Sequence, residues 1–302
     1  MAVARVTAGG LAHAGSAPQA RASQSGLRRF ARTFRRNRGA LLGLALLLVL
    51  AGLALLAPAI APYNPIKQSA AEVLEPPSRA HWFGTDQYGR DILSRVLIGA
   101  RLSLRVGLVS VAIAAACGSV LGLLAGYYGG LADTVIMRLI DVKLAFPGIL
   151  LAMAIVAVLG PSLVNLMIAV GIGGIPTYTR VVRASVLSGK ELLYVLAARA
   201  TGCPDRCIMF LHILPNVLAP VIVLSTLSIA GAILAASGLS FIGLGAQPPT
   251  PEWGAMLSTG RQFLRDAWWM TTFPGLAIMV TVMSINLVGD GLRDALDPRL
   301  RL

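Results

Sequence analysis

The chain has 302 residues, of which 56% are hydrophobic and only 13% are charged, and its formal net charge is +13. A soluble protein usually carries about a quarter charged residues, so this composition excludes a soluble globular protein. Nearly uncharged stretches of about twenty residues recur, the length that a helix needs to cross a bilayer core of about 30 Å. These runs are continuous rather than alternating, which indicates spanning helices rather than a barrel.

The basic residues at the amino-terminal end precede an apolar run. Eight arginines and no acidic residue lie in residues 1–39, a pattern typical of a cytoplasmic anchor. Residues 1–26 lack apolar periodicity, as disordered segments do, whereas residues 27–38 have the spacing of a helix lying on anionic lipid. The run 40–57 is long for a cleaved signal, so we expect a retained span and no nucleic-acid partner.

Hydropathy predicts an all-α integral membrane fold with six spans. They are expected at residues 40–60, 104–126, 144–160, 162–178, 215–238 and 271–289. Gly160 and Pro161 separate the third span from the fourth. The fourth is the weakest, because glycines and Pro176 interrupt it, and such residues are tolerated where neighbouring helices pack closely.

The distribution of basic residues predicts the orientation. With both termini cytoplasmic, the inner side holds 18 of the 26 basic residues, as the positive-inside rule requires. The expected organisation is then a basic tail, a first span, an outer loop, a core domain of five spans and a cytoplasmic tail. Their bounds are 1–39, 40–60, 61–103, 104–291 and 292–302. Within the core, residues 239–270 form a second outer loop, and residues 179–214 form the long cytoplasmic loop.

The chain carries no feature that would let it power transport alone. Its only Gly-Lys pair, Gly189-Lys190, is followed by Glu191, so no phosphate-binding loop is present. Ion-coupled carriers place ionisable residues near the membrane midplane. Here Asp141, Lys143 and Asp290 are expected at span ends, with nearly uncharged span cores. The pore is therefore either driven by a docked partner or a passive channel.

The cytoplasmic loop is predicted to form a helix, a turn and a second helix. Residues 181–200 are rich in Val, Leu and Ala, and Gly202 is suited to end a helix in the left-handed conformation. Pro204 and Asp205 then resemble a helix start, with proline at the first helical position. The second helix runs to about Leu211, and Pro215 marks entry into the fifth span. Such a hairpin is either a contact for a partner or an ordinary connection between spans.

The three cysteines do not predict a disulfide framework. Cys117 falls in an apolar run, and Cys203 and Cys207 lie four residues apart, with His212 nearby. A metal site needs more ligands than this spacing assures, so no metal site is expected.

The outer loop contains a charged cluster among glycines. Asp86, Arg90 and Asp91 are interpreted either as a latch near the outer mouth or as a solvent-exposed turn with an internal ion pair, worth under about 1 kcal/mol. A structural or gate-adjacent role is favoured over contact with substrate. Farther along, Trp253 and the Trp268-Trp269 pair are expected at the membrane interface.

Several motifs resemble those of bacterial importer permeases. Ala197-Ala198, Gly202 and His212-Ile213-Leu214-Pro215 have the spacing of the "EAA" loop, although Leu196 replaces the common glutamate and His212 a common isoleucine. Residues 84–91 resemble the "GTDxxGRD" segment of the second permease in dipeptide, oligopeptide, nickel and glutathione importers. Further similar segments are Ala145 to Gly148, Ser240 to Gly245, Pro248 to Gly254 and Gly289 to Asp294.

The resemblance implies a type I ABC importer permease (MetI-like) fold and a non-catalytic role. The implied partners are a second permease, two ATP-binding subunits and an extracytoplasmic substrate-binding protein in the bacterial inner membrane. ATP and Mg²⁺ would then reside on the ATP-binding subunits, and this chain would bind no cofactor. The implied cargo is a short peptide, with nickel or glutathione as alternatives. The implied residues are, in the coupling loop, Ala197, Ala198, Gly202, Cys203, Pro204, Asp205, His212, Leu214 and Pro215, and, in the outer motif, Gly84, Thr85, Asp86, Gly89, Arg90 and Asp91. A passive channel and a membrane-embedded enzyme remain the rivals, and the enzyme fits poorly, because no span holds paired catalytic groups.

Overall fold

A computed structural model describes residues 33–296, so most of the basic tail and the last six residues lie outside the described part. The described chain is helical, and its one β-type contact is an isolated bridge between Thr85 and Asp91. The helices are α2 (Arg38–Ile60), α3 (Ile92–Tyr128), α4 (Gly130–Leu144), α5 (Gly148–Leu159), α6 (Leu163–Gly189), α7 (Leu193–Ala200), α8 (Asp205–Cys207), the π-helix η1 (Ile208–Ile213), α9 (Leu214–Phe241), α10 (Trp253–Gly260), the 3-10 turn η2 (Arg261–Phe263) and α11 (Trp269–Leu296).

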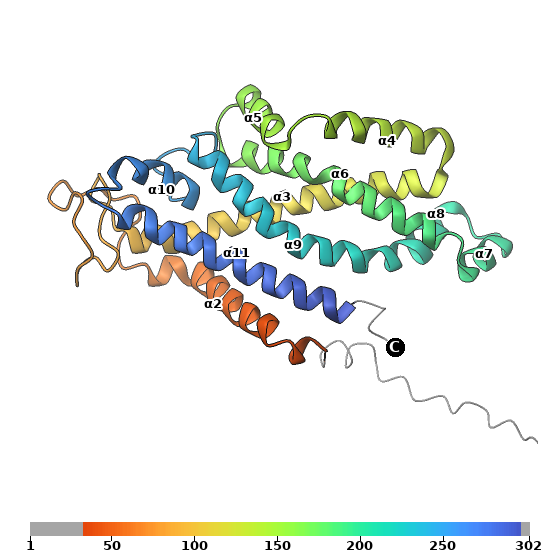
Figure 1. Cartoon of the computed structure of the whole chain (residues 1–302), viewed down its shortest axis with the longest axis horizontal. Coiled ribbons are helices and arrows are strands. Elements are labelled where there is room, and N and C mark those ends of the chain that lie inside the picture. Colours follow the sequence, from red (N-terminus) through yellow and green to blue (C-terminus); the bar gives the residue numbers. More distant parts are fainter. Residues whose placement is uncertain (1–32, 297–302) are drawn as a thin grey trace, which may run out of the picture.

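The long helices lie side by side in an elongated bundle (Figure 1). By length and composition, α2, α3, α11 and the helix running through α8 to α9 are each able to span a membrane. The pair α4 and α5, bent by 89°, makes a fifth span if it is counted as one. Helix α6 is 27 residues long, but glycine, proline and hydroxyl residues lower its hydropathy. The predicted all-α membrane fold is confirmed, whereas the count of six spans is met only if α6 and the bent pair are included.

Four spans were predicted in the right place, and the third was not. The expected span 144–160 is only the 12-residue α5, which meets α4 at a sharp bend. The weak fourth span is longer than predicted, because α6 continues past residue 178 to Gly189 despite Pro176 inside it. Helix α11 likewise continues past residue 289 to Leu296, so the expected tail 292–302 begins inside a helix.

The closest helix pair, α3 with α6, is held by a stripe of small residues. Gly118, Gly122 and Gly126 recur every four residues along α3 and face α6. A Cβ added at Gly122 would lie 2.6 Å from the carbonyl oxygen of Thr179. Small residues at this spacing let two helix backbones approach in a membrane, where van der Waals packing drives association. The α3–α6 pair therefore forms the centre of the bundle.

The bundle has two ends of different construction (Figure 1). The outer-loop end, defined as residues 61–95 and 242–269, carries the long loop after α2 and helix α10. The coupling-loop end, defined as residues 190–213, carries α7, α8 and η1, and the described start of α2 and end of α11 lie toward it. Helix α3 begins at Ile92 rather than near residue 104. The helix predicted over residues 181–200 is present as two pieces, the end of α6 and helix α7, with a break at residues 190–192.

Candidate functional site

At the coupling-loop end, a short helix is packed by aliphatic side chains. Val195 of α7 is fully buried against Val182 and Val186 of α6 and Ile208 and Ile213 of η1. Gly202 ends α7 with a φ of +81°, as predicted. The amide of Cys203 donates to the carbonyl oxygen of Ala198 at 3.0 Å, which closes the turn. Residues 193–204 therefore form a compact unit rather than a free hairpin.

The second helix of this loop differs from the prediction in its start and its end. Pro204 is the N-cap rather than the first helical residue, and Asp205 begins α8. There is no break at Leu211 or Pro215, because residues 205–241 form one 37-residue helix through α8, η1 and α9. Asp205 is tied to α3 by the hydroxyl of Tyr127, which donates to its carboxylate at 2.5 Å. The predicted loop residues Ala197 and Ala198 lie on α7, and Leu214 and Pro215 lie inside the long helix.

The solvent side of this segment carries large apolar side chains. Leu193 is 84% exposed and Leu211 is 69% exposed. The other members of this coupling-loop patch are Leu192, Tyr194, Leu196 and Phe210, each at least 40% exposed. Large exposed apolar side chains gathered in one short segment are typical of an interaction surface.

Cys203, Cys207 and His212 come together at the start of the long helix. Their potential metal-ligating atoms all lie within 4.8 Å of one another, and all three residues are partly buried. The two sulfur atoms are paired as a disulfide, with the Cα atoms 6.1 Å apart. Cys117, expected in an apolar run, lies apart from them on α3 and is exposed. The spacing of four residues alone did not predict this group of three.

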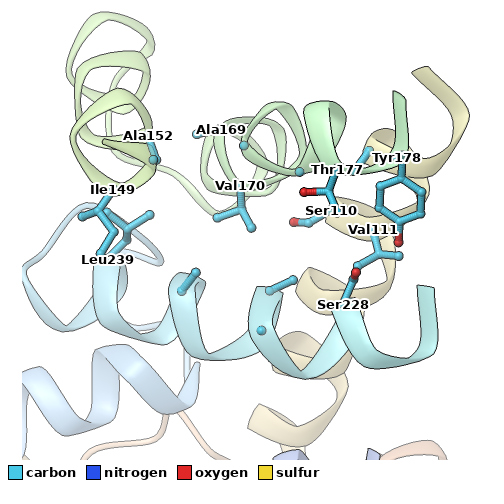
Figure 2. Close-up of a pocket in the computed structure, with 17 residues that line it drawn as sticks. Ser110, Val111, Ile149, Ala152, Ala169, Val170, Thr177, Tyr178, Ser228 and Leu239 are labelled. Atoms are coloured by element: carbon cyan, nitrogen blue, oxygen red, sulfur yellow. The ribbon is translucent and has the colours of Figure 1, made fainter. Parts of the chain in front are cut away.

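A cavity of about 380 Å³ lies among α3, α5, α6 and α9 (Figure 2). Its walls are mainly small: Ala114, Ala152, Ala169, Gly173, Gly174, Gly231, Ala232 and Ala235 all line it. Figure 2 shows the hydroxyl groups of Ser110, Thr177, Tyr178 and Ser228 on one side of it and the aliphatic Ile149 and Leu239 on the other. The lining residues carry no formal charge. Sequence reasoning assigned none of these residues.

Both long helices of the coupling loop form walls of this cavity. Helix α6 leads from Thr177 and Tyr178 into α7, and α9 leads from Ser228 back to α8. The Tyr178 hydroxyl donates to Ser225 Oγ at 3.1 Å and so joins α6 to α9 beside the cavity. Helix α8 is therefore joined to a cavity wall by continuous helix, and α7 is joined to one through the turn at residues 190–192.

Helix α4 brings charged residues against α6, all of them outside the predicted span ranges. Arg183 of α6 donates two hydrogen bonds to the carboxylate of Asp133, at 2.5 and 2.6 Å. Arg180 pairs with Asp141 at 2.7 Å, and both are half exposed. Lys143 donates to the carbonyl oxygen of Gly173, a residue that lines the cavity. Lys143 of α4 therefore contacts α6 near the middle of that helix.

At the outer-loop end, the predicted motif is buried rather than solvent-exposed. Asp86, Arg90, Asp91 and Arg95 are each at most 5% exposed. The carboxylate of Asp86 accepts from Arg90 Nε at 2.7 Å and lies 3.6 Å from Arg95 Nε. Asp91 caps α3, accepting from the Ser94 amide at 2.8 Å, and it lies 2.9 Å from the ring of His81. The interpretation as an exposed turn is wrong, because pairing satisfies these charges inside the protein.

The same motif joins segments far apart in the sequence. The carbonyl of Thr85 accepts from the indole of Trp269 at 3.0 Å, and Arg95 Nη1 donates to the carbonyls of Pro65 and Pro249. Gly84 and Gly89 both have positive φ, and a Cβ at Gly89 would lie 1.9 Å from the carbonyl oxygen of Ser69. The six motif residues thus form one structural unit, the outer knot, with no surface for substrate.

Two tryptophans expected at the membrane interface are instead buried in this unit. Trp253 is 1% exposed and donates to the carbonyl of Val96, and Trp269 is 5% exposed. Trp268, in contrast, is 50% exposed. Beside Trp253, the buried Glu252 caps α10 by accepting from the amides of Gly254 and Ala255, each at 2.9 Å. Burial raises the pKa of Glu252 above its usual value, and the two amide hydrogen bonds oppose that shift.

Comparison with known proteins shows which protein family the sequence matches. Residues 118–302 match the family described as the binding-protein-dependent transport system inner membrane component, and residues 25–77 match the N-terminal TM domain of oligopeptide transport permease C. The chain is 50% identical over 283 residues to the di/tripeptide transport system permease protein DppC of Pseudomonas aeruginosa, covering 92% of this chain and 93% of that protein. It is 49% identical over 267 residues to the dipeptide transport system permease protein DppC of Alkalihalophilus pseudofirmus, covering 88% of each. It is 47% identical over 275 residues to the glutathione transport system permease protein GsiD of Pectobacterium atrosepticum, covering 91% of each.

Proposed function

Because this chain belongs to the family of binding-protein-dependent transport system inner membrane components, we propose that it passes short peptides across the membrane when separate ATP-binding subunits move its coupling loop. It is a permease subunit and a multi-pass inner membrane protein. The chain itself makes and breaks no bond. Transport needs no cofactor on this chain, because ATP with Mg²⁺ acts on the ATP-binding subunits.

One observation carries the coupling proposal: the helix that begins at the coupling loop also forms a cavity wall. Residues 205–241 are one helix, and at a rise of 1.5 Å per residue about 35 Å separate Asp205 from Ser228. Helix α6 gives α7 a second path to the same cavity, through the turn at residues 190–192. A push on α7 and α8 therefore changes the separation of α6 and α9 where the cargo passes.

The coupling-loop patch is the proposed docking surface for the ATP-binding subunit. Its exposed apolar side chains stand on a short helix held by the buried Val195. An apolar anchor on a rigid element is favourable for binding, because little conformational freedom is lost on association. The departure of Leu196 from the common glutamate leaves this patch more apolar than the family motif suggests.

The cavity suits an uncharged or zwitterionic peptide of small size. It offers hydroxyl groups on one side and aliphatic groups on the other, and it lacks formal charge. A transport path must bind its cargo weakly enough for release. Recognition then belongs to the external binding protein, and relatives named for dipeptides and tripeptides support a peptide cargo. Glutathione is the second candidate, on the strength of the 47% identical relative named for it.

The remaining subunits follow from the same proposal. A companion permease completes the path, two ATP-binding subunits dock on the cytoplasmic side, and the binding protein delivers cargo to the outer-loop end. Both termini are cytoplasmic, which the eight arginines of residues 1–39 support through the positive-inside rule. The described ends of α2 and α11 lie toward the coupling loop, in agreement with this orientation.

The test is uptake of a labelled dipeptide into proteoliposomes holding the full set of subunits. We expect uptake only with ATP, and we expect Leu193→Ser to reduce it at least tenfold while the variant chain remains folded in the membrane. The matched control is Leu264→Ser, which removes an exposed leucine at the outer-loop end and should leave uptake unchanged. Uptake by this chain alone without ATP would indicate a passive channel, and wild-type uptake by Leu193→Ser would exclude the proposed docking surface.

A further inference from the structure

The transport path described above uses neither the thiols of Cys203 and Cys207 nor the imidazole of His212, although Cys203 packs against the aliphatic cluster around Val195. Two cysteines and a histidine of one short segment direct their ligand atoms to a common point, with none more than 4.8 Å from another. Two thiols and an imidazole are the donor set of many zinc sites. We propose that this group is a Zn²⁺ site at the coupling-loop end of the chain. The proposal does not depend on the proposed cargo or on the direction of transport.

The local helix type explains why His212 joins the two cysteines. Cys207 and His212 are five residues apart, and on an α-helix this spacing turns two side chains away from each other. Residues 208–213 are instead a π-helix, in which hydrogen bonds join residues five apart. The amide of Leu214 accordingly donates to the carbonyl of Met209. The wider turn brings His212 onto the same face as Cys207, and such π segments frequently occur at functional sites.

The turn before α8 supplies the third ligand. Cys203 directly follows Gly202, whose positive φ reverses the chain, and its amide is fixed by Ala198. A tetrahedral Zn²⁺ with bonds of about 2.3 Å to sulfur and 2.0 Å to nitrogen spaces its ligand atoms about 3.5 to 3.8 Å apart. The three ligand atoms lie within 4.8 Å of one another, which is close to the spacing that such an ion requires.

The chemistry of the donors selects the metal. Thiolate ligands favour Zn²⁺ over hard cations such as Mg²⁺ and Ca²⁺, which take oxygen ligands. Binding converts two thiols to thiolates and releases two protons, so that the net charge of the group in the Zn²⁺ complex is zero. Three protein ligands leave the fourth tetrahedral position for water or for a group from a docked subunit. In the structure Cys203 and Cys207 are paired as a disulfide, so metal binding first requires a thiol or phosphine reductant that supplies two electrons and yields the two thiols.

Metal binding at this point would connect the turn after α7 to the first turns of the long helix. Cys203 belongs to the turn, and Cys207 and His212 belong to α8 and η1. A bound ion would fix the angle between α7 and the 37-residue helix, which is the geometry that any partner at the coupling-loop patch contacts. We therefore assign to the ion a positioning role.

The test uses the full chain, purified in detergent with a reductant and with an affinity tag free of histidine. Co²⁺ is the probe, since thiolate-to-cobalt charge transfer and tetrahedral d–d bands report directly on the ligands. We expect one Co²⁺ per chain, displaced by Zn²⁺. Cys203→Ser and Cys207→Ser should lose the charge-transfer band by half or more and weaken binding at least tenfold, and His212→Ile should weaken binding at least tenfold. Cys117→Ser is the matched control and should bind as the wild type does.

Two results would overturn the proposal. One is the lack of a thiolate–cobalt band in the reduced wild-type chain, and the other is binding that is unchanged in Cys203→Ser or Cys207→Ser. Should these variants fail to fold, X-ray absorption on the Zn²⁺-loaded wild-type chain identifies the atoms that bind the ion. Two sulfur neighbours at about 2.3 Å support the site, whereas neighbours that are only nitrogen and oxygen exclude it.

Discussion

The two ends of this protein both carry recognisable motifs, but they are built in opposite ways. At the outer-loop end, charged side chains are buried, paired and tied to backbone from both halves of the chain. At the coupling-loop end, the motif residues are mostly exposed, and aliphatic contacts hold the segment through Val195 and the residues around it. A motif of the first kind stabilises the fold, and one of the second kind leaves a surface free for a partner. Similarity of sequence alone does not distinguish the two.

The largest expected effect is at the buried ion pairs. Asp86→Asn removes the charge that balances Arg90 and Arg95, and breaking a buried pair from one side costs about 3–5 kcal/mol. Thermal unfolding in detergent should show this loss, with less protein in the membrane. Asp266→Asn, at an exposed position of the same end, is the control and should be within about 0.5 kcal/mol of wild type. Equal stability of the two variants would contradict the structural role of the outer knot.

Alanine substitutions at two glycines distinguish the energetic cost of overpacking from that of backbone strain. Gly89 and Gly202 both have positive φ, but a Cβ at Gly89 meets the Ser69 carbonyl, whereas a Cβ at Gly202 has nothing within 4 Å. Gly202→Ala should cost only the strain of about 1–2 kcal/mol. Gly89→Ala should cost about 3 kcal/mol, because overpacking adds to the strain. Unfolding free energies measured for both variants give the comparison, and the reverse order would contradict it.

A smaller effect is expected where α8 meets α3. Tyr127→Phe removes the hydroxyl that donates to Asp205, and a hydrogen bond of this kind contributes about 1 kcal/mol. We expect peptide uptake to fall clearly while the unfolding free energy changes by only about 1 kcal/mol. The reason is that the change loosens the coupling-loop end without disturbing the outer knot. Tyr63→Phe is the control, since it removes a hydroxyl that donates to Ala80 at the other end. A greater loss of uptake in Tyr63→Phe would reverse the comparison.

The smallest expected effect is a pH dependence at the outer-loop end. Burial raises the pKa of Glu252 above 4.5, so the folded protein binds a proton more readily there than the unfolded chain does. This contribution to stability therefore grows as the pH falls from neutral toward 4.5 and is lost as the pH rises through the raised pKa. In thermal unfolding, the unfolding free energy of the wild type should rise relative to that of Glu252→Gln as the pH falls over this range. A difference that stays constant with pH would show that Glu252 does not titrate there.

The sequence predicted the membrane helices wherever apolar residues alone determine them. Helices α2, α9 and α11 contain their predicted spans almost entirely. The error at the third span has a physical cause: Asp133 and Asp141 lower the hydropathy of α4, yet Arg183 and Arg180 of α6 pair with them. A hydropathy window treats each aspartate as an unpaired charge. The arginine that pairs with it lies about forty or more residues away in the sequence, outside the window.

The same limit applies to the loops and to the candidate site. The charges of Asp91 and Arg95 indicated a loop, although Asp91 caps α3 and Arg95 lies inside it. The turn at Gly202 was predicted from its local chemistry, and its φ confirms it. The cavity was not predicted, since small residues from four helices define it and no local pattern marks them. The position of His212 was also beyond prediction, because it depends on a π-helix.

The outer knot also sets an order of events during synthesis. The Trp269 indole bonds Thr85, 184 positions earlier, and Arg95 bonds Pro249 across 154 positions. Until the ribosome has delivered α11 to the membrane, the segment around Thr85 lacks these partners and its buried charges remain incompletely enclosed. A chain stopped before residue 269 is therefore left open at this end, where cellular proteases that remove unfinished membrane proteins have access. The outer loop around Thr85 therefore acquires its full set of hydrogen bonds only after α11 has been inserted.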